Sequence, residues 1–510
     1  MKKRVNRGAS QSRSTSLPTA TDGWVTIKNL GQMKPTEAIV LDNWFPLETE
    51  IKIRQGSSVH GTGLGGSVDT TFGYSGPTAD KLLAAANGKI WDVTAAGAGT
   101  QLATTFTSNR WQNINFSTDG GNFALMANGA DGPQTFDGVA VTTSNLTGND
   151  LVTTKLVQPF AFKERIFYVE KDSLAFWYHT SVRQIAGELS RVNLGGVFRL
   201  GGYLQAGATW TRDGGSGIDD YAVFITSNGE VAIYQGDDPG DASRWALVGV
   251  YRVGAPLGRR CWMKYANDLA LITQDGIVPM GSVLSRDRTG LSMEALSANI
   301  SPTFTSVAKN YQANFGWSGM LYPNGRMAIF NIPTTTATYQ YILNTNTRAW
   351  CRFTGLAATS WGLSADVPYF GTAGGVVMKF DDGLTDNDAA VSAQYKSSFQ
   401  YFGNRNDFKH FKMVRPVFRS DANINFGYGV DNDFNDTTID FETGGSGAGT
   451  QWDEGLWDQF QWSGGNNTFQ NWQGADGTGR CGSIKIAINN SEYQISHLST
   501  DWVWEEGGIL

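Results

Sequence analysis

A hairpin-like pattern recurs along most of this chain: an apolar alternating run, a turn centred on glycine, asparagine or aspartate, and a second apolar alternating run. Its clearest copy spans residues 221–235, where Asn228-Gly229 is a strong signal for a tight turn between antiparallel strands. Most turn centres are roughly 40 to 60 residues apart, the spacing expected of four-stranded propeller blades. We therefore predict an all-β chain with a β-propeller body. The other copies occupy residues 82–93, 123–138, 164–178, 269–280, 339–353 and 368–383.

The predicted propeller body covers residues 57–383. Its length corresponds to seven or eight blades of about 40 to 45 residues. A closed ring of blades would leave few exposed sheet edges. Two segments interrupt the hairpin pattern: residues 183–202, for which we expect a long loop or an inserted element, and residues 302–311, for which Ser301 and Pro302 indicate a helix start.

The two ends of the chain have a different character. Residues 1–22 form a basic arm without periodicity and are predicted to be disordered, or to order only against a neighbouring subunit or nucleic acid. Residues 23–56 form an apolar strap, with a short helix expected over 36–41 and Thr36 as its N-cap. Residues 384–510 are predicted to be a separate antiparallel β domain on which the strap packs.

The charge composition limits the possible partners. Charged residues are only 17% of the chain, against about 25% in typical soluble domains. This scarcity favours a subunit that hides much of its surface in an assembly.

The net charge is −7, and the main body has no cluster of lysine and arginine suited to binding duplex DNA. No apolar run approaches the roughly 18 residues that span a bilayer, and we expect synthesis in the cytoplasm.

Catalytic motifs are weak. Residues 61–66 match GxGxxG, but no helical pattern follows, so a dinucleotide site is not expected. The four histidines form no close pair, and the three widely spaced cysteines are expected to be buried free thiols. Neighbouring carboxylates, which a glycosidase could use if they converged in a cleft, occur at Asp219-Asp220, Asp237-Asp238 and Asp381-Asp382. We expect no cofactor.

One segment resembles a calcium-binding loop. Asp431, Asp433, Asn435 and Glu442 match oxygen-ligand positions of such a loop. The sixth position is Asp436 where glycine is usual, and no flanking helices are indicated. An acidic turn between strands is therefore the preferred interpretation.

Aromatic residues provide the candidate contact surfaces. Their two interpretations are a stack of core aromatics and a platform for a partner subunit or a sugar. The candidates are Trp44 and Phe45 in the strap, and Trp452, Trp457, Trp462 and Trp472 in the C-terminal region.

Short sequence motifs at both ends of the chain resemble those of the tail-nozzle proteins of short-tailed bacteriophages, also called tail tubular or packaged-DNA-stabilising proteins. A propeller-like body lies between these motifs, as it does in that family. The motifs are residues 33–38, 41–46 (LDNWFP) and 54–56 (RQG), Trp452-Asp453 with Trp457-Asp458, and residues 505–508 (EEGG).

The resemblance implies a non-enzymatic virion protein in a ring, expected to hold six copies, that continues the portal and adaptor channel below the capsid. Expected partners are copies of the chain, the adaptor, tail fibres or spikes, and duplex DNA in transit. An acidic wall repels phosphate and agrees with this role. The alternatives are a propeller glycosidase or lyase using carboxylates such as Asp219 or Asp237, and a carbohydrate- or receptor-binding module using the tryptophans.

Overall fold

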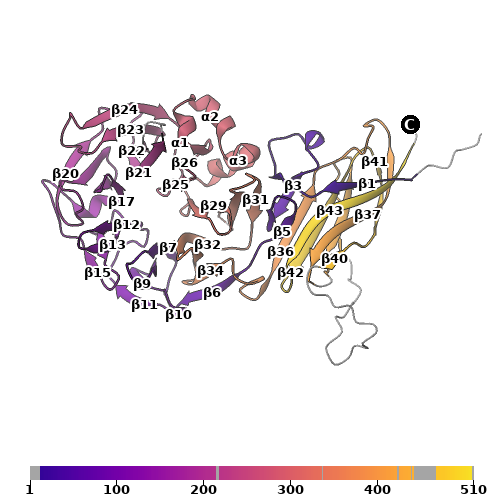
Figure 1. Ribbon diagram of the computed structural model, residues 1–510, viewed down its shortest axis with the longest axis horizontal. Coiled ribbons are helices and arrows are strands. Elements are labelled where there is room, and N and C mark those ends of the chain that lie inside the picture. The colour runs from indigo at the N-terminus through magenta and orange to yellow at the C-terminus, as the bar shows by residue number, and fades with distance from the viewer. Residues whose placement is uncertain are drawn as a thin grey trace, which may run out of the picture. The chain divides into compact units, whose positions relative to one another are not determined.

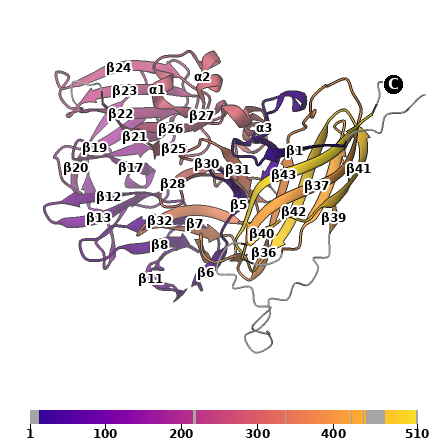
Figure 2. The same cartoon turned by 45° about the vertical axis from the view of Figure 1, so that its right-hand side comes forward.

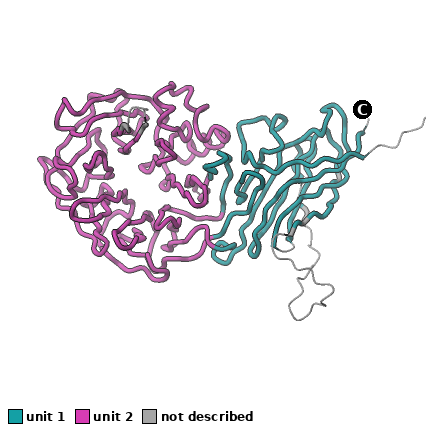
Figure 3. The backbone as a smooth tube through the Cα atoms, in the orientation of Figure 1, with its two compact units in different colours: residues 1–56, 342–354, 383–510 teal, residues 57–341, 355–382 magenta. Residues whose placement is uncertain are grey.

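The structure is a computed structural model that describes residues 12–213, 218–335, 337–421, 424–437, 439–441 and 467–507. Strands dominate it, and the chain divides into two compact units (Figure 3). The first unit comprises residues 1–56, 342–354 and 383–510, and the second comprises residues 57–341 and 355–382. Among the described helices, none is long and apolar enough to cross a membrane.

The second unit is a ring of antiparallel sheets (Figure 1). Five sheets follow one another along the chain, and their first strands lie toward the middle of the ring. They are β7 (Val68–Tyr74), β8 (Lys81–Ala86), β9 (Lys89–Asp92) and β11 (Thr100–Ala103); β12 (Gln112–Thr118), β13 (Gly121–Ala127), β14 (Gln134–Phe136) and β15 (Val141–Thr143); β17 (Leu156–Phe162), β18 (Arg165–Glu170), β19 (Ala175–His179) and β20 (Gly187–Asn193) with β16 (Leu146–Thr147); β21 (Leu204–Asp213), β22 (Ile218–Thr226), β23 (Glu230–Gly236) and β24 (Trp245–Arg252); and β25 (Trp262–Tyr265), β26 (Asp268–Thr273) and β27 (Gly276–Pro279).

Two further groups of strands continue the ring, and a short helical segment precedes them. The predicted propeller is thus confirmed, with sheets of unequal strand number. The strands are β28 (Ser318–Tyr322), β29 (Met327–Pro333) and β30 (Thr338–Asn344), then β32 (Ala358–Ser364), β33 (Val367–Thr372) and β34 (Val377–Phe380) with β6 (Ser57–Thr62) and β10 (Gly97–Ala98). The helices are α1 (Met280–Val283), α2 (Arg288–Glu294) and α3 (Ser301–Tyr311), with 3-10 turns η2 (Thr153–Lys155) and η3 (Ala298–Ile300).

The predicted hairpins form because their turn residues suit the backbone that a tight turn needs. Asn87 and Gly88, between β8 and β9, both have positive φ, as a type I′ turn requires. The Asn228-Gly229 signal likewise lies between paired strands β22 and β23, with Gly229 at φ +81°. Buried aromatic and aliphatic side chains from neighbouring sheets then pack together, as Phe160, Phe167, Phe176 and Phe224 do between the third and fourth sheets.

The ends of the second unit close the ring. Strand β6, at the start of the unit, completes the sheet of β32–β34 at its end. The backbones of β7 and β32 approach closely at Gly362. A Cβ added to this glycine would lie 2.5 Å from the carbonyl oxygen of Thr71. The hydroxyls of Thr71 and Ser360 are 3.0 Å apart across the same junction.

Replacing Gly362 with alanine should therefore open this junction. We expect a loss of about 1–3 kcal/mol in the free energy of unfolding, because rigid backbone must shift to admit the methyl group. Chemical denaturation measures the loss. Gly374→Ala in the adjoining turn is the control, since its Cβ would meet only the Thr372 hydroxyl at 3.9 Å. Equal stability of the two variants would contradict the proposed tight closure.

The first unit contains two groups of paired strands, and Figure 2 shows β37 beside β43. Its core is rich in aromatic rings, including Phe402, Phe411 and Trp502, whose centroids are 5.0 to 5.4 Å apart. One group contains β1 (Ser12–Pro18), β4 (Trp44–Pro46), β5 (Ile51–Ile53), β37 (Lys409–Ser420), β40 (Asn467–Phe469), β41 (Gln473–Gly479) and β43 (Ile495–Glu506). The other contains β2 (Gly23–Trp24), β3 (Glu37–Asp42), β31 (Trp350–Phe353), β35 (Thr385–Asp386), β36 (Ala389–Ser397), β38 (Gly427–Asn432), β39 (Asp440–Phe441) and β42 (Gly482–Asn490); a 3-10 turn, η1, spans Leu30–Gln32.

The strap and the C-terminal region share hydrogen-bonded strands in this unit. Strand β3 pairs with β36, and β5 pairs with β43. The sequence did not indicate that residues 342–354 also belong here, where β31 pairs with β2 and β3.

Three local expectations were wrong. Residues 12–18, placed in a disordered arm, form β1 along β43; residues 1–11 lie outside the described part of the chain. Within the segment 36–41, residues 37–41 belong to strand β3 instead of a helix, because β2 and β36 supply hydrogen-bond partners on both sides. Thr36 lies in the preceding turn, where its hydroxyl bonds to Asp22. Residues 187–193 form β20, an ordinary propeller strand, within the expected interruption. The helix over 302–311 is confirmed as α3.

Candidate functional site

The main candidate site is a cavity of about 400 Å³ inside the second unit. It lies next to the first residues of strands β12, β17 and β21. Its walls come from loops and strand ends of successive sheets. The β11–β12 loop supplies Arg110, the β18–β19 turn supplies Lys171, and the β24–β25 loop supplies Arg259 and Arg260. The segment between α3 and β28 contributes Phe315. The cavity is therefore strongly basic.

A second cavity of about 240 Å³ shares Gln112, Arg259 and Arg260 with the first. It is lined by residues of first strands, among them Thr71 of β7 and Trp361 of β32. We call the two together the axial cavity. Neither cavity has an aspartate or glutamate in its lining among the described residues.

The two adjacent arginines are anchored by carbonyl groups. Arg260 donates from one amino group to the carbonyl oxygens of Asp69 and Trp111, both at 3.0 Å, and to the Thr70 hydroxyl at 2.8 Å. Arg259 donates to the carbonyl oxygens of Leu204 and Gln205 at 3.4 and 3.2 Å. These bonds fix both guanidinium groups between sheets that are distant in sequence.

The charge of these arginines is only partly compensated. Burial lowers the pKa of Arg260 to about 10, and the positive charge of Arg110 acts in the same direction. Burial also lowers the pKa of Arg259. Both groups remain cations at neutral pH, so a concentrated positive charge faces the cavity.

The Phe315 ring lies near two of the cations. The Arg110 guanidinium lies 4.0 Å from the centroid of the Phe315 ring, and that of Arg260 lies 5.6 Å from it. Cation–π attraction to the ring face holds the two groups despite their mutual repulsion. The nearest carboxylate to Arg110 is Asp69, at 3.7 Å.

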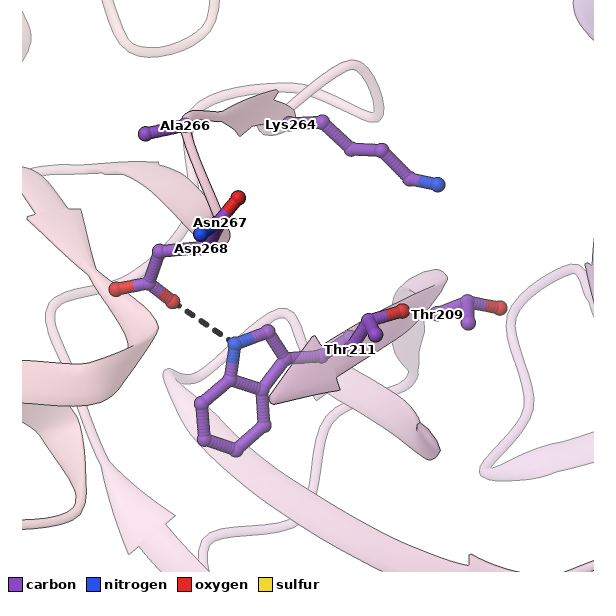
Figure 4. Close-up of a pocket in the computed structure, with 7 residues that line it drawn as sticks. Thr209, Thr211, Lys264, Ala266, Asn267 and Asp268 are labelled. Atoms are coloured by element: carbon purple, nitrogen blue, oxygen red, sulfur yellow. Dashed lines mark hydrogen bonds between the residues drawn. The ribbon is translucent and has the colours of Figure 1, made fainter. Parts of the chain in front are cut away.

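A third pocket, of about 370 Å³, lies beside β21 and the β25–β26 turn (Figure 4). The indole N–H of Trp210 donates to a carboxylate oxygen of Asp268 at 2.9 Å. Asp268 also accepts bonds from the backbone N–H groups of Leu269 and Gly281. These donors hold Asp268 as a structural acceptor, and the pocket offers no second carboxylate among its lining residues.

The calcium-loop residues form a lysine–carboxylate network instead. Asp431 is fully buried and pairs with Lys396 at 2.5 Å and Lys485 at 3.5 Å. Both lysines also contact Asp436 and lower its pKa to about 2. The described residues hold no group of three or more side chains suited to a metal ion.

Two other ligand positions of that loop, Asp433 and Asn435, make backbone hydrogen bonds. Asp433 accepts bonds from the backbone N–H groups of Arg480 and Cys481. The backbone N–H of Asn435 bonds to the carbonyl of Asn432, closing the turn, and Glu442 lies outside the described residues. Two ammonium groups at the buried carboxylate disfavour a bound cation.

The aromatic contact candidates divide into three cases. Trp44 and Phe45 are buried within the first unit, so they support its core instead of an exposed contact surface. Trp472 is 39% exposed and stacks against the Arg415 guanidinium at 4.7 Å, which leaves it a candidate contact residue. Trp452, Trp457 and Trp462 lie outside the described residues.

Several of the neighbouring carboxylates have local partners in the structure. Asp237 pairs with Arg244, whose hydrogen bond lowers the pKa of that carboxyl group. Asp220 accepts a bond from the Thr211 hydroxyl. Asp381 accepts one from Tyr322, whereas Asp382 pairs with Lys379. The side chain of Asp219 is not among those described.

Sequence reasoning missed the axial cavity. Its one sequence signal is the adjacent pair Arg259-Arg260 just before a short strand. Arg110, Lys171 and Phe315 come from distant loops, and nothing in their spacing indicates that they converge.

No protein-family model matches the chain, and no curated protein matches it. Solved structures with a similar arrangement include BamB from Moraxella catarrhalis, with TM-score 0.35 and 11% identity over 66% of this chain and 92% of that one. A chain of the mitotic checkpoint complex has TM-score 0.36 and 10% identity over 64% and 94%. An exo-β-1,3-galactanase from Phanerochaete chrysosporium has TM-score 0.25 and 9% identity over 76% and 95%.

Proposed function

We propose that this chain is a non-catalytic structural subunit of the tail nozzle of a short-tailed bacteriophage. In this proposal, six copies form a ring that extends the portal and adaptor channel in the virion tail. The ring retains packaged DNA and passes it at ejection without sequence-specific binding. Its other neighbours are the adaptor and the tail fibres or spikes.

The observation that carries the proposal is the role of the strap residues on which the family resemblance rests. Asn43, Arg54 and Gly56 lie together in one buried cluster of the first unit, which we call the strap hub. Asn43 has a left-handed backbone (φ +59°), and its side chain binds both the backbone N–H and the hydroxyl of Thr354 at 2.9 Å. Arg54 donates to Asn43 at 2.8 Å.

The strap hub joins three separate segments of the chain. Arg54 binds Asp386 through two amino groups, and a Cβ on Gly56 would lie 1.9 Å from the carbonyl oxygen of Thr385. Asp42, next to Asn43, pairs with Arg352 through both oxygens. The strap motifs at residues 41–46 and 54–56 therefore have a defined structural role. This role supports interpreting them as a family signature rather than a chance match.

Surface composition supports an assembling subunit. The outer strand β24 exposes three apolar side chains: Leu247 at 45%, Val248 at 47% and Val250 at 38%. An outer strand with unpaired backbone groups and apolar side chains favours contact with another chain. The acidic net charge of −7 supports a wall along which DNA slides without sticking.

The enzymatic alternative is less favoured because every described carboxyl group with a shifted pKa has a lowered one. A glycosidase needs one carboxyl group with a raised pKa and a second carboxyl group about 5 to 9.5 Å away. Asp237 has the opposite shift because of Arg244. The sugar- or receptor-binding alternative depends mainly on tryptophans outside the described residues.

Electron microscopy of the purified protein, alone and with the adaptor from the same virus, tests the proposal. We expect rings with sixfold symmetry. A protein that remains monomeric at every concentration, with and without adaptor, would contradict it. Turnover of host capsule or lipopolysaccharide that is abolished by Asp237→Asn would favour the enzyme, whereas sugar binding lost in Trp457→Ala with assembly intact would favour the binding module.

Replacing exposed apolar side chains of β24 with charged ones should weaken the association of subunits into a ring. We expect the double variant Leu247→Glu, Val250→Glu to shift rings toward monomers, because buried carboxylates without partners oppose association. Analytical ultracentrifugation measures the shift. The control is Val139→Glu, at an 81% exposed position in another sheet. Wild-type rings in the double variant would show that β24 is not the contact between subunits. Electron microscopy of the wild-type protein would still decide whether the chain forms a ring.

A further inference from the structure

The axial cavity contains more positive charge than the surrounding protein balances. Four cations line it: Arg110, Lys171, Arg259 and Arg260. The carboxylates that attract them, Asp69 and Asp172, are not part of its lining. Arg259 and Arg260 are partly buried, and holding two adjacent positive charges in a partly desolvated space is unfavourable unless an anion compensates them.

The cations also retain unused hydrogen-bond donors. Arg259 and Arg260 each use a single amino group for their carbonyl partners, and Nε and the second amino group make no bond to the described protein atoms. Lys171 donates to the carbonyl oxygen of Gly129 at 3.0 Å, which leaves two of its three N–H donors free of described partners. Fixed guanidinium groups with free N–H donors match the oxygen geometry of phosphate and carboxylate groups.

The size of the space sets the class of ligand. A volume of about 400 Å³ falls within the range of small-molecule pockets and is far too small for a nucleic-acid duplex. Tyr203, Phe315 and Trp317 add apolar surface to the same lining. A compact molecule with several anionic oxygens fits this combination.

We propose that the axial cavity binds a small oxyanion that carries phosphate or carboxylate groups, with Arg110, Lys171, Arg259 and Arg260 as its ligands. The bound anion would neutralise the cations and tie together sheets from different parts of the ring. This inference does not depend on the proposed function in a virion.

Isothermal titration calorimetry on the full chain tests the proposal with pyrophosphate and citrate as probes. We expect saturable one-to-one binding of at least one probe, and the tighter of the two identifies the preferred oxyanion. Arg110→Met and Lys171→Met should each weaken binding about tenfold or more, since each removes a charged donor. Arg110 is an exposed side chain, so its replacement should leave the fold intact.

The control is Arg286→Met, which removes an exposed arginine that pairs with Glu294 and does not line the cavity. It should bind the probes as the wild type does. Arg260→Met is a second test, with circular dichroism confirming that the variant is folded. Absence of saturable binding for both probes, or wild-type affinity in Arg110→Met and Lys171→Met, would overturn the proposal. Ring formation in the microscope is a separate readout, so failure here is distinct from failure of the proposed function.

Discussion

Replacing Arg54 with alanine should lower the free energy of unfolding of the first unit by about 3–5 kcal/mol. The Arg54 side chain is fully buried, and its removal leaves Asp386 as a largely buried carboxylate without its bidentate partner. It also deprives the carbonyl oxygen of Thr354 and the side chain of Asn43 of donors. Urea denaturation followed by tryptophan fluorescence measures the loss.

An exposed ion pair in the same unit is the matched control. Arg13 pairs with Glu506 at 2.7 Å, with side chains 55% and 38% exposed, and Arg13→Ala should cost no more than about 1 kcal/mol. The double variant Arg54→Met, Asp386→Leu should recover part of the loss, because it leaves no buried charge. A loss below about 1 kcal/mol in Arg54→Ala would mean that the strap hub does not hold the unit together.

Acidification from pH 7 to pH 4 should cost about 3 kcal/mol at each of two buried histidines. Burial lowers the pKa of His497 to about 3, and burial with the nearby Arg165 charge lowers the pKa of His179 to about 4. In the unfolded chain both imidazoles have a pKa of about 6.5. The unfolded state therefore binds more protons below pH 6.5, and stability falls as the pH drops toward the folded-state pKa values.

The two histidines report on different units. His497, in the first unit, contacts the hydroxyls of Thr19 at 2.7 Å and Thr500 at 3.0 Å, whereas His179 lies in the second unit. His497→Gln should lower stability at pH 7 but flatten the pH dependence of the first unit. Unchanged wild-type stability between pH 7 and pH 4 would contradict neutral burial of both rings.

The hairpins of the propeller could be predicted because their signals are local. A turn such as Asn87-Gly88 selects its backbone conformation through residues that tolerate positive φ, and flanking alternation selects strands. Helix α3 was predictable for the same reason, from a serine, a proline and an apolar face within eleven residues. Such signals do not need the rest of the chain.

The candidate site could not be predicted, because its residues meet only through ring closure. Arg110, Lys171 and Arg259 lie in three different connecting segments and have no shared spacing. The segment that resembles a calcium-binding loop was interpreted from the sequence as an acidic turn. Its sequence did not indicate that Lys396 and Lys485 would pair with Asp431, because those contacts form only in the tertiary structure.

The sequence by itself determined that this protein is a series of β-hairpins with a compositionally distinct strap and C-terminal region, since turn residues and alternation act over a few positions. Only the tertiary structure decided that residues 37–42 form a strand, because hydrogen bonds to β2 and β36 outweigh a weak helix signal. It alone also decided that residues 342–354 join the first unit and that four cations line one cavity. Those outcomes depend on contacts between residues far apart in the chain, which no local pattern encodes.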